Sequence, residues 1–411
     1  MLTFKAAHEL LARHVGPLAP ATRRVTDVVG CRLAGEVSAV TDWPIGNVST
    51  MDGYAARTSD TTDRESLPIA FEVPAGQTPS ALPPGACARI FTGALLPSGA
   101  DVVIPEEHAE CAGERVRLPT LDAGNFIRPR GEVCHVGDVL GSSGNVVTPQ
   151  LLGLLVAAGP IEISVWSRPR VGILTTGSEL LAPDAELVPG RIRDSNGPML
   201  AALAVQAGLS VTCVDRAEDT LEHIAHRLEV ICASSDFVVT NGGVSVGKYD
   251  LLPQAIEFLS GELLFHRVAI RPGKPILVAR LGSTWLIGLP GNPVSAFVGW
   301  HAFVRPLAER LAGATQVVDP PTIAARITEP VENPGVRMVL SPVRLEDGCE
   351  GCTAAPLRWK GSHDIVALAR ANGLLLIDSG QQRDAGATME CLDLRLSCVR
   401  GAHARQAQPS R

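Results

Sequence analysis

The sequence predicts a multidomain α/β plus β fold, with a central α/β domain between a β-rich N-terminal region and a small C-terminal β domain. From residue 168 to about 312, apolar strand segments alternate with helical segments roughly every 25–40 residues. This pattern is typical of a mostly parallel sheet with helices on both faces. On either side, the apolar runs are short and separated by glycine and proline, which favours β structure. The 411 residues suffice for about two to four domains.

The N-terminal region is expected to cover residues 1–167. It begins with an amphipathic helix, and a β-rich insert follows from about 45 to 140. Short strands are expected in the insert at 69–73, 88–91, 102–104 and 116–118. A helix at 150–158 closes the region.

The α/β domain is expected to cover 168–312. Its helices are expected at 195–207, 220–234 and 252–259 and after Pro293, and its strands at 171–175, 210–214, 236–240, 264–270, 276–279 and 285–289. The C-terminal β domain is expected at 318–400, with strands at 322–327, 337–344, 373–377 and 391–399. The polar tail, 401–411, is expected to be disordered.

Composition and charge narrow the class of protein. Apolar residues make up 45% and charged residues 19% of the chain, as in globular proteins. A net charge of −7 argues against a nucleic-acid-binding protein. No segment has the roughly 20 unbroken apolar residues of a membrane span, and the N-terminus does not read as a signal peptide. A cytoplasmic protein is therefore expected.

The ten cysteines do not form a convincing metal pattern. Cys349 and Cys352 have the spacing of a metal or redox pair, which Cys391 and Cys398 could complete. The second pair lies on an apolar, strand-like run, so we interpret the cysteines mainly as reduced thiols rather than a zinc site or disulfides.

Three loops follow predicted strands of the α/β domain, at the sheet edge where such folds bind ligands. They cover 175–179, 240–250 and 289–296. The second is rich in glycine, which lets backbone amides approach an anion, and the third places Pro293 at the start of a helix. Each loop alone could be an ordinary turn, but three on one edge favour a binding site.

A fourth segment, Arg-Pro-Gly-Lys-Pro at 271–275, places two cations on a rigid turn at the same edge. Only four of the 36 basic residues are lysines: Lys5, Lys248, Lys274 and Lys360. Scarce lysine in such a turn suggests a preorganised oxyanion site, although exposed basic residues more often lie on a solvated surface. Carboxylates at Asp52, Glu179, Asp236 and Asp250 are suitable ligands for a Mg²⁺ ion that bridges phosphates, although Asp236 could simply begin a strand.

These segments together resemble the MoeA family, the molybdopterin molybdenumtransferases, which are related to the E domain of gephyrin. The resemblance rests on STMDGYA at 49–55, RIFTGALLPSGAD at 89–101, RPRGE at 128–132, RPRVGILTTGSEL at 168–180, RIRDSN at 191–196, NGGVSVGKYD at 241–250, RPGKP at 271–275, LPGNPVSAF at 289–297 and SHDIVALARANGL at 362–374. The motifs occur in family order across nearly the whole chain.

The resemblance implies an enzyme that inserts molybdenum from molybdate into adenylylated molybdopterin, with Mg²⁺-dependent release of AMP. It implies that the N-terminal region, 1–167, consists of two subdomains. It also implies an elongated homodimer in which the α/β domain of one protomer and the N-terminal region of the other share an active site. A molybdopterin adenylyltransferase is the upstream partner that it implies.

The roles carried over by resemblance fall into four groups. The catalytic set is Asp52, Thr92, Glu179, Asp236 and Asp250, of which Glu179, Asp250 and Asp52 are expected to bind Mg²⁺. The expected adenylylated-molybdopterin contacts are Thr176, Gly177, Ser178, Asn196, Gly242, Gly243, Val244, Ser245, Gly247, Pro290, Gly291, Asn292 and Pro293. The expected molybdate contacts are Arg271, Lys274, Pro275, Ser295, Arg337 and Ser362.

Two positions depart from the family pattern. Val133 stands where relatives often have a carboxylate, and Arg271 stands where a lysine is frequent. The alternatives are a paralogue that handles tungstate, a non-catalytic molybdopterin-binding scaffold, and a competence-damage-related nucleotide hydrolase. The last would lack the 49–55 and 89–101 motifs.

Overall fold

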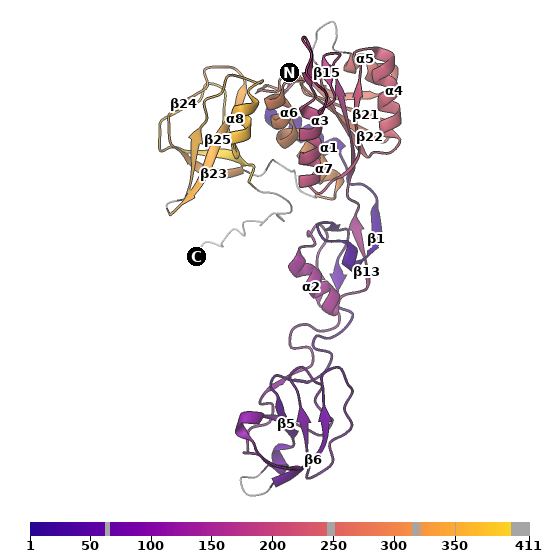
Figure 1. The fold of residues 1–411 in the computed structure, drawn as a ribbon, viewed down its shortest axis with the longest axis vertical. Helices are drawn as coiled ribbons and strands as arrows, with labels where there is room; N and C mark the ends of the chain where they lie inside the picture. The colour runs from indigo at the N-terminus through magenta and orange to yellow at the C-terminus, as the bar shows by residue number, and fades with distance from the viewer. Residues whose placement is uncertain (62–65, 245–250, 315–319, 321, 350, 396–411) are drawn as a thin grey trace.

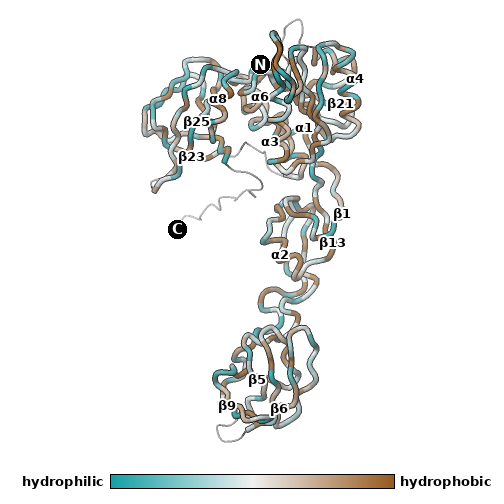
Figure 2. The backbone as a smooth tube through the Cα atoms, in the orientation of Figure 1, coloured by the Kyte–Doolittle hydropathy of each residue, from teal (hydrophilic) through white to brown (hydrophobic). Residues whose placement is uncertain are grey.

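The computed structural model describes residues 1–61, 66–244, 251–314, 320, 322–349 and 351–395. The molecule is elongated (Figure 1): the α/β and C-terminal domains lie side by side at one end, the β-rich insert lies at the other, and a small subdomain lies between them. Hydrophobic segments occur in every part along this length (Figure 2), as expected for a chain with several separate cores.

The α/β domain is built on a six-stranded sheet of order β17-β14-β18-β22-β21-β19. Its strands are β14 (Arg170–Thr176), β17 (Ser210–Ala217), β18 (Phe237–Asn241), β19 (Glu262–His266), β21 (Leu277–Leu281) and β22 (Thr284–Leu289). The first four strands in that order are parallel, and β21 runs antiparallel to both of its neighbours, β22 and β19. Because β14, β17, β18 and β22 are parallel, their carboxyl ends lie at the same edge of the sheet.

Helices cover both faces of this sheet. The helical elements are α1 (Phe4–His14), α3 (Asn196–Gln206), α4 (Leu221–Cys232), α5 (Leu252–Phe258), α6 (Pro293–Gly299), a π-helical turn (Trp300–Val304) and α7 (Arg305–Leu311). One core packs α4 and α5 against the sheet, and the other packs α1, α3, α6 and α7. Because α1 buries Ala7 and Leu11 in the second core, the first helix belongs with the α/β domain rather than with the N-terminal sheets.

The N-terminal region forms two units. The middle subdomain has a three-stranded sheet of order β1-β13-β2 and one helix. Its elements are β1 (Pro20–Arg24), β13 (Glu162–Trp166), β2 (Arg32–Leu33) and α2 (Pro149–Ala158). A 3₁₀ turn (Val25–Asp27) and the pair β3 (Val37–Ser38) and β12 (Val139–Gly141) complete it. The pair β4 (Val48–Ser49) and β11 (Ile127–Arg128) leads to the insert.

The insert is a second six-stranded sheet, of order β8-β5-β7-β6-β10-β9. Its strands are β5 (Gly53–Ala56), β6 (Ser66–Val73), β7 (Cys87–Ile90), β8 (Val102–Pro105), β9 (Glu110–Ala112) and β10 (Arg115–Arg117), with 3₁₀ turns at Thr58–Asp60 and Glu106–His108. Alternate residues of β5 and β7 enter two different apolar clusters, so both faces of the sheet are covered.

The C-terminal domain is a six-stranded sheet of order β20-β25-β26-β23-β29-β27, which an extra β25–β27 pairing closes on itself. Its elements are β20 (Ile270–Arg271), β23 (Thr322–Ile327), β25 (Met338–Gly348), β26 (Gly351–Pro356), α8 (Ile365–Arg370), β27 (Gly373–Ile377) and β29 (Thr388–Asp393). A two-stranded pair in this domain consists of β24 (Val331–Glu332) and β28 (Gln382–Arg383). A second two-stranded pair, β15 (Leu180–Leu181) and β16 (Ile192–Arg193), belongs to the α/β domain.

The predicted fold class is confirmed, with one difference that matters for the site. The strand expected at 264–270 is divided in two, because Arg267 adopts a positive φ of 73° between β19 and β20. The second piece, β20, leaves the α/β sheet and pairs with β25. The tail at 401–411 lies outside the described residues. No helix in the described part of the chain is both long and apolar enough to cross a membrane.

Candidate active site

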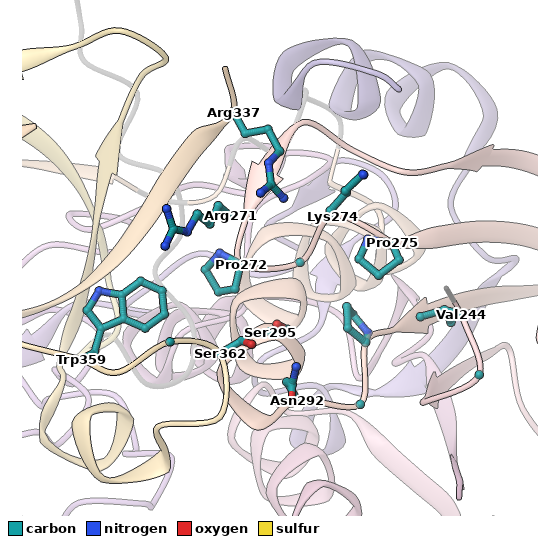
Figure 3. Close-up of a pocket in the computed structure, with 15 residues that line it drawn as sticks. Val244, Arg271, Pro272, Lys274, Pro275, Asn292, Ser295, Arg337, Trp359 and Ser362 are labelled. Carbon is teal, nitrogen blue, oxygen red and sulfur yellow. The ribbon is translucent and has the colours of Figure 1, made fainter. Parts of the chain in front are cut away.

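A cavity of about 500 Å³ lies where the α/β and C-terminal domains meet, and we name it the anion pocket. All six residues expected to contact molybdate line it: Arg271, Lys274, Pro275, Ser295, Arg337 and Ser362. Five of the expected substrate contacts line it too: Gly243, Val244, Pro290, Gly291 and Asn292. Figure 3 shows the lining residues placed around the pocket on elements of both domains. The structure thus brings together residues that are up to 119 positions apart (243 to 362).

Contacts between the two domains hold the walls of the pocket in place. Arg271 lies on β20, which pairs with β25 through Arg271 and Val339. The Arg337 guanidinium donates to the carbonyl of Ile270 at 3.3 Å. On the other side, the amide of Val294 donates to the carbonyl of Ser362 at 3.0 Å. Because both domains also share one apolar core, the two walls form one preassembled site.

The pocket concentrates positive charge. Within the described residues, Arg271, Lys274 and Arg337 form no ion pair with a carboxylate. Two hydroxyl-bearing residues line the same pocket: Ser295, which is buried, and Ser362, which is half-buried. Three uncompensated cations with two hydroxyls are suited to a compact dianion, because charge-assisted hydrogen bonds are stronger than neutral ones.

Buried amides tie together the loops at the end of the sheet. The Asn196 amide donates to Oδ1 of Asn241 at 2.8 Å and to the carbonyl of Gly291 at 2.6 Å. Asn241 in turn donates to the carbonyl of Pro290 at 2.7 Å. Asn196 therefore connects the loops that follow β18 and β22, which is a positioning role rather than an evident substrate contact.

The glycine loop passes directly over β14. A Cβ on Gly242, where φ is 97°, would lie 2.5 Å from the carbonyl oxygen of Thr176, so a larger residue has no room. The Thr176 hydroxyl beneath the loop is buried and has no partner among the described residues. Ser245, Gly247 and Asp250 lie outside the described residues.

Glu179 presents an exposed carboxylate beside this loop. A Cβ on Gly177 would lie 2.7 Å from Oε2 of Glu179, so the carboxylate lies over that glycine. It makes no hydrogen bond or ion pair with another residue in the described ranges. The neighbouring Ser178 donates its amide and hydroxyl to Asp219, at 2.9 and 3.2 Å.

Sequence reasoning missed Asp219 and chose Asp236 instead. Asp219 follows β17 and therefore reaches the same edge as the other loops. Asp236 immediately precedes β18, at the opposite end of the sheet, where it accepts hydrogen bonds from the Arg170 amide at 2.7 Å and guanidinium at 2.9 Å. The structure therefore does not bring Asp236 to the candidate site, because parallel strands separate their two ends.

Asp52 and Thr92 form a separate unit in the insert. The Thr92 amide and hydroxyl both donate to Oδ1 of Asp52, at 2.7 and 2.8 Å. These bonds, the amide first, hold the pKa of the Asp52 carboxyl below its ordinary value. The insert lies at the opposite end of the molecule from the anion pocket (Figure 1), so one chain does not bring the two together.

Trp359, Gly361, Pro272 and Gly273 also line the anion pocket and were not predicted individually. Pro272 and Gly273 belong to the basic turn that the sequence singled out. Trp359 precedes the 362–374 motif by three positions, and no spacing rule would have placed it at the pocket.

The cysteines and the departure at Val133 lie away from this pocket. The nine described cysteines are free, and four of them are buried. The part of the chain that the structure describes contains no cluster of three or more His, Cys, Asp and Glu residues that could hold a metal ion. Val133 is exposed, and its neighbour Glu132 pairs with Arg128 at 3.0 Å.

Three family models match consecutive parts of the chain. They are described as the MoeA N-terminal region (domain I and II), at residues 2–159, a probable molybdopterin binding domain, at 172–310, and the MoeA C-terminal region (domain IV), at 324–394. Together they cover most of the sequence in the order of the observed domains.

Relatives and solved structures agree with these matches. Molybdopterin molybdenumtransferase 2 of Mycobacterium tuberculosis is 34% identical over 390 residues, covering 91% of this chain and 95% of the relative. Molybdopterin molybdenumtransferase of Staphylococcus aureus is 33% identical over 370 residues, 88% of each chain. The molybdopterin biosynthesis MoeA protein of Pyrococcus horikosii has a TM-score of 0.80 at 28% identity, over 96% of this chain and 99% of that one. With full-length relatives, matched domains and a preassembled anion pocket, the chain belongs to the MoeA family of molybdopterin molybdenumtransferases, enzymes of molybdenum cofactor biosynthesis.

Proposed function

We propose that this enzyme transfers molybdenum from molybdate to the dithiolene of adenylylated molybdopterin, with Mg²⁺-dependent cleavage of the pyrophosphate bond and release of AMP. The observation that carries the proposal is the anion pocket, in which Arg271, Lys274 and Arg337 have no carboxylate partner in the described structure. Such a pocket favours a small oxyanion over a neutral ligand.

In this proposal the pocket binds molybdate as a substrate. Lys274 acts as a compact charge, and the two arginines supply planar pairs of donors. The Ser295 and Ser362 hydroxyls complete the donor set, and Pro275 keeps the turn rigid. Preorganised donors of this kind stabilise the oxyanion without reorganisation during the reaction.

The loops beside the pocket are proposed to bind the phosphate and adenylate part of the substrate. The set comprises Thr176, Gly177, Ser178, Gly242, Gly243, Val244, Ser245, Gly247, Pro290, Gly291, Asn292 and Pro293. Positive φ angles at Gly242 and Gly243 allow the backbone to approach a phosphate closely. Asn196 keeps these loops in register.

The donor set at Glu179 fits a substrate-bridged Mg²⁺ ion. Mg²⁺ commonly binds one or two protein carboxylates together with substrate phosphates, rather than a cage made only of protein ligands. Glu179 is a free carboxylate next to the phosphate-binding loops, and Asp250 belongs to the same glycine loop in sequence. When bound, the ion supplies charge neutralisation on the pyrophosphate oxygens. Asp219 holds Ser178 and so orients the loop that carries Glu179.

A homodimer is proposed because Asp52 and Thr92 lie far from the anion pocket of their own chain (Figure 1). In a dimer, Asp52 of the partner subunit would complete the acidic set, held in its ionised form by Thr92. The adenylylated substrate requires a preceding nucleotidyl transfer, which a molybdopterin adenylyltransferase would perform.

Purified protein incubated with adenylylated molybdopterin, Mg²⁺ and molybdate tests this function. Molybdate-dependent AMP release together with activation of an apo-molybdoenzyme is the expected result. Substrate binding without either would instead indicate a carrier or scaffold. Because molybdate and tungstate have the same charge and shape, the lining of the anion pocket does not distinguish them. The same assay with tungstate in place of molybdate does, since higher activity with tungstate would indicate a tungstate-handling paralogue.

A further inference from the structure

A second cavity, of about 660 Å³, adjoins the anion pocket on the side of the C-terminal domain, and we name it the outer hollow. Arg271, Trp359 and Gly361 line both cavities. The remaining lining of the outer hollow is Val331, Glu332, Asn333, Pro334, Gly335, Val339, Ser341, Lys360 and Ile377. The two cavities are therefore neighbouring compartments with a common wall that includes an indole ring.

Trp359 is held in position on the wall between the two cavities. The segment around it is anchored by the Leu357 amide on Pro342, the Lys360 amide on Asp364 and the Val294 amide on Ser362. The indole is half-buried and packs against the core that the two domains share. Within the described residues it forms no ring pair, cation–π contact or hydrogen bond.

The outer hollow has a mixed lining. Its aliphatic residues are Val331, Val339 and Ile377, and its polar residues include Glu332, Asn333, Ser341 and Lys360. The indole and the aliphatic side chains offer an apolar surface, and the polar groups offer hydrogen-bond partners, which together suit the flat face and the polar edge of a heterocycle. Aromatic side chains in such sites bind a planar heterocycle by stacking on its face.

The order of groups in the proposed substrate matches the order of the compartments. In molybdopterin the dithiolene carbons lie between the fused pterin ring system on one side and the phosphate-bearing carbon on the other. In Figure 3, Val244 of the glycine loop and Trp359 lie on opposite sides of the pocket, with Lys274 and Ser295 between them. A dithiolene at the cations, with its phosphate toward the glycine loop, extends its pterin toward Trp359.

We propose that Trp359 and the outer hollow form the pterin-binding compartment of this enzyme, with the pterin ring stacked on the indole. The proposal rests on the proposed function, since it takes adenylylated molybdopterin as the substrate. In this proposal Trp359 increases the affinity for the substrate through the pterin ring, and it binds neither the oxyanion nor the adenylate.

The variants Trp359→Ala and Trp359→Phe test this assignment in the full-length enzyme. We expect Trp359→Ala to raise KM for adenylylated molybdopterin roughly tenfold, as for loss of one stacked base, and Trp359→Phe to stay within about threefold of wild type. The Kd for molybdate should change less than about twofold in both variants, because the cations of the anion pocket remain.

Competition with free pterin and with AMP identifies the ring that stacks. Free pterin should inhibit the wild type and lose most of its inhibition in Trp359→Ala, while inhibition by AMP stays unchanged. Loss of AMP inhibition instead would place adenine on Trp359 and overturn the proposal. An unchanged KM in an active Trp359→Ala enzyme would overturn it as well. A wild type that neither binds molybdate nor releases AMP would remove the proposed function itself, which is a different result.

Discussion

The anion pocket and the Asp52–Thr92 unit are built in opposite ways. The pocket joins two domains of one chain and leaves three cations without carboxylate partners in the described structure. The Asp52 carboxylate, by contrast, is already satisfied by two donors from Thr92, and it lies on an exposed turn at the far end of the molecule. The anion pocket is therefore arranged to bind a small anion within one chain. The Asp52–Thr92 unit reaches an anion pocket only if that pocket belongs to another chain.

The largest effect should come from removing a cation of the anion pocket. We expect Lys274→Met to weaken molybdate binding and molybdate-dependent AMP release by about 10- to 100-fold, since a hydrogen bond to a charged group contributes roughly 1.5–3 kcal/mol. Isothermal titration with molybdate measures the loss of affinity directly. The control is Lys5→Met, which removes an equal charge from the exposed side of α1. Equal molybdate affinity in Lys274→Met and wild type would contradict the pocket assignment.

A complementation experiment tests whether Asp52 of one chain and the anion pocket of another form a shared active site. Asp52→Ala and Lys274→Met should each be nearly inactive alone. After unfolding and refolding together, statistical mixing gives about half heterodimers, each with one intact composite site, so activity should recover to about a quarter of wild type.

No recovery in a mixture that size-exclusion and mass measurements show to contain heterodimers would mean that the site is not shared between chains. The matched control mixes Asp52→Ala with Asp52→Asn. Both variants lack the same carboxylate, so no dimer in this mixture has an intact composite site and the mixture should stay inactive.

Substitution of Asn196 tests the buried hydrogen bonds that connect the loops beside the pocket, and its effect on activity should be intermediate. Asn196→Ala leaves the Asn241 side chain and the Gly291 carbonyl without their donor, which costs roughly 1–3 kcal/mol for groups of this burial. Urea unfolding should show lower stability, and KM for adenylylated molybdopterin should rise because the loops lose register. A stable variant with an unchanged KM would show that the loops hold their positions without this bridge.

Asp236 should have little effect on activity. It pairs with Arg170 at the amino end of β18, so Asp236→Asn should keep kcat within about twofold of wild type and lower stability by about 1 kcal/mol or less. Asp219→Asn is the informative comparison, because it disturbs the Ser178 contact beside Glu179. If Asp236→Asn abolished turnover with an intact fold, Asp236 would take part in the reaction despite its place at the opposite end of the sheet.

The contrast between Asp219 and Asp236 shows what sequence reasoning can and cannot provide. Alternation of strands and helices predicted the parallel sheet, and hence that loops after its strands meet at one edge. The same rule would have excluded Asp236, which precedes its strand, and included Asp219, which follows one.

The C-terminal wall was less accessible to such rules. Arg337 and Ser362 came only from the family resemblance, because their approach depends on β20 leaving one sheet for another. The departure occurs at Arg267, whose positive φ no hydrophobic pattern encodes. Trp359 had neither a motif nor a periodicity to mark it, so only the packed structure places it at the pocket.

The smallest effect concerns the pH dependence of the Asp52 turn. The Thr92 amide, then its hydroxyl, then the Arg89 charge lower the pKa of Asp52 in the folded state. A carboxyl with a lowered folded pKa stabilises the fold above its unfolded pKa, near 3.9, and the contribution disappears as the pH falls through the folded pKa. Wild type should therefore lose stability of the insert between about pH 5 and 3 more steeply than Asp52→Asn, as amide exchange of β5 would report. Thr92→Ala should be intermediate, because Asp52 then keeps only the amide donor. Identical pH profiles for all three proteins would mean that the Thr92 contacts do not hold the carboxylate ionised, and the far end of the molecule would then offer a partner chain a less acidic group than proposed.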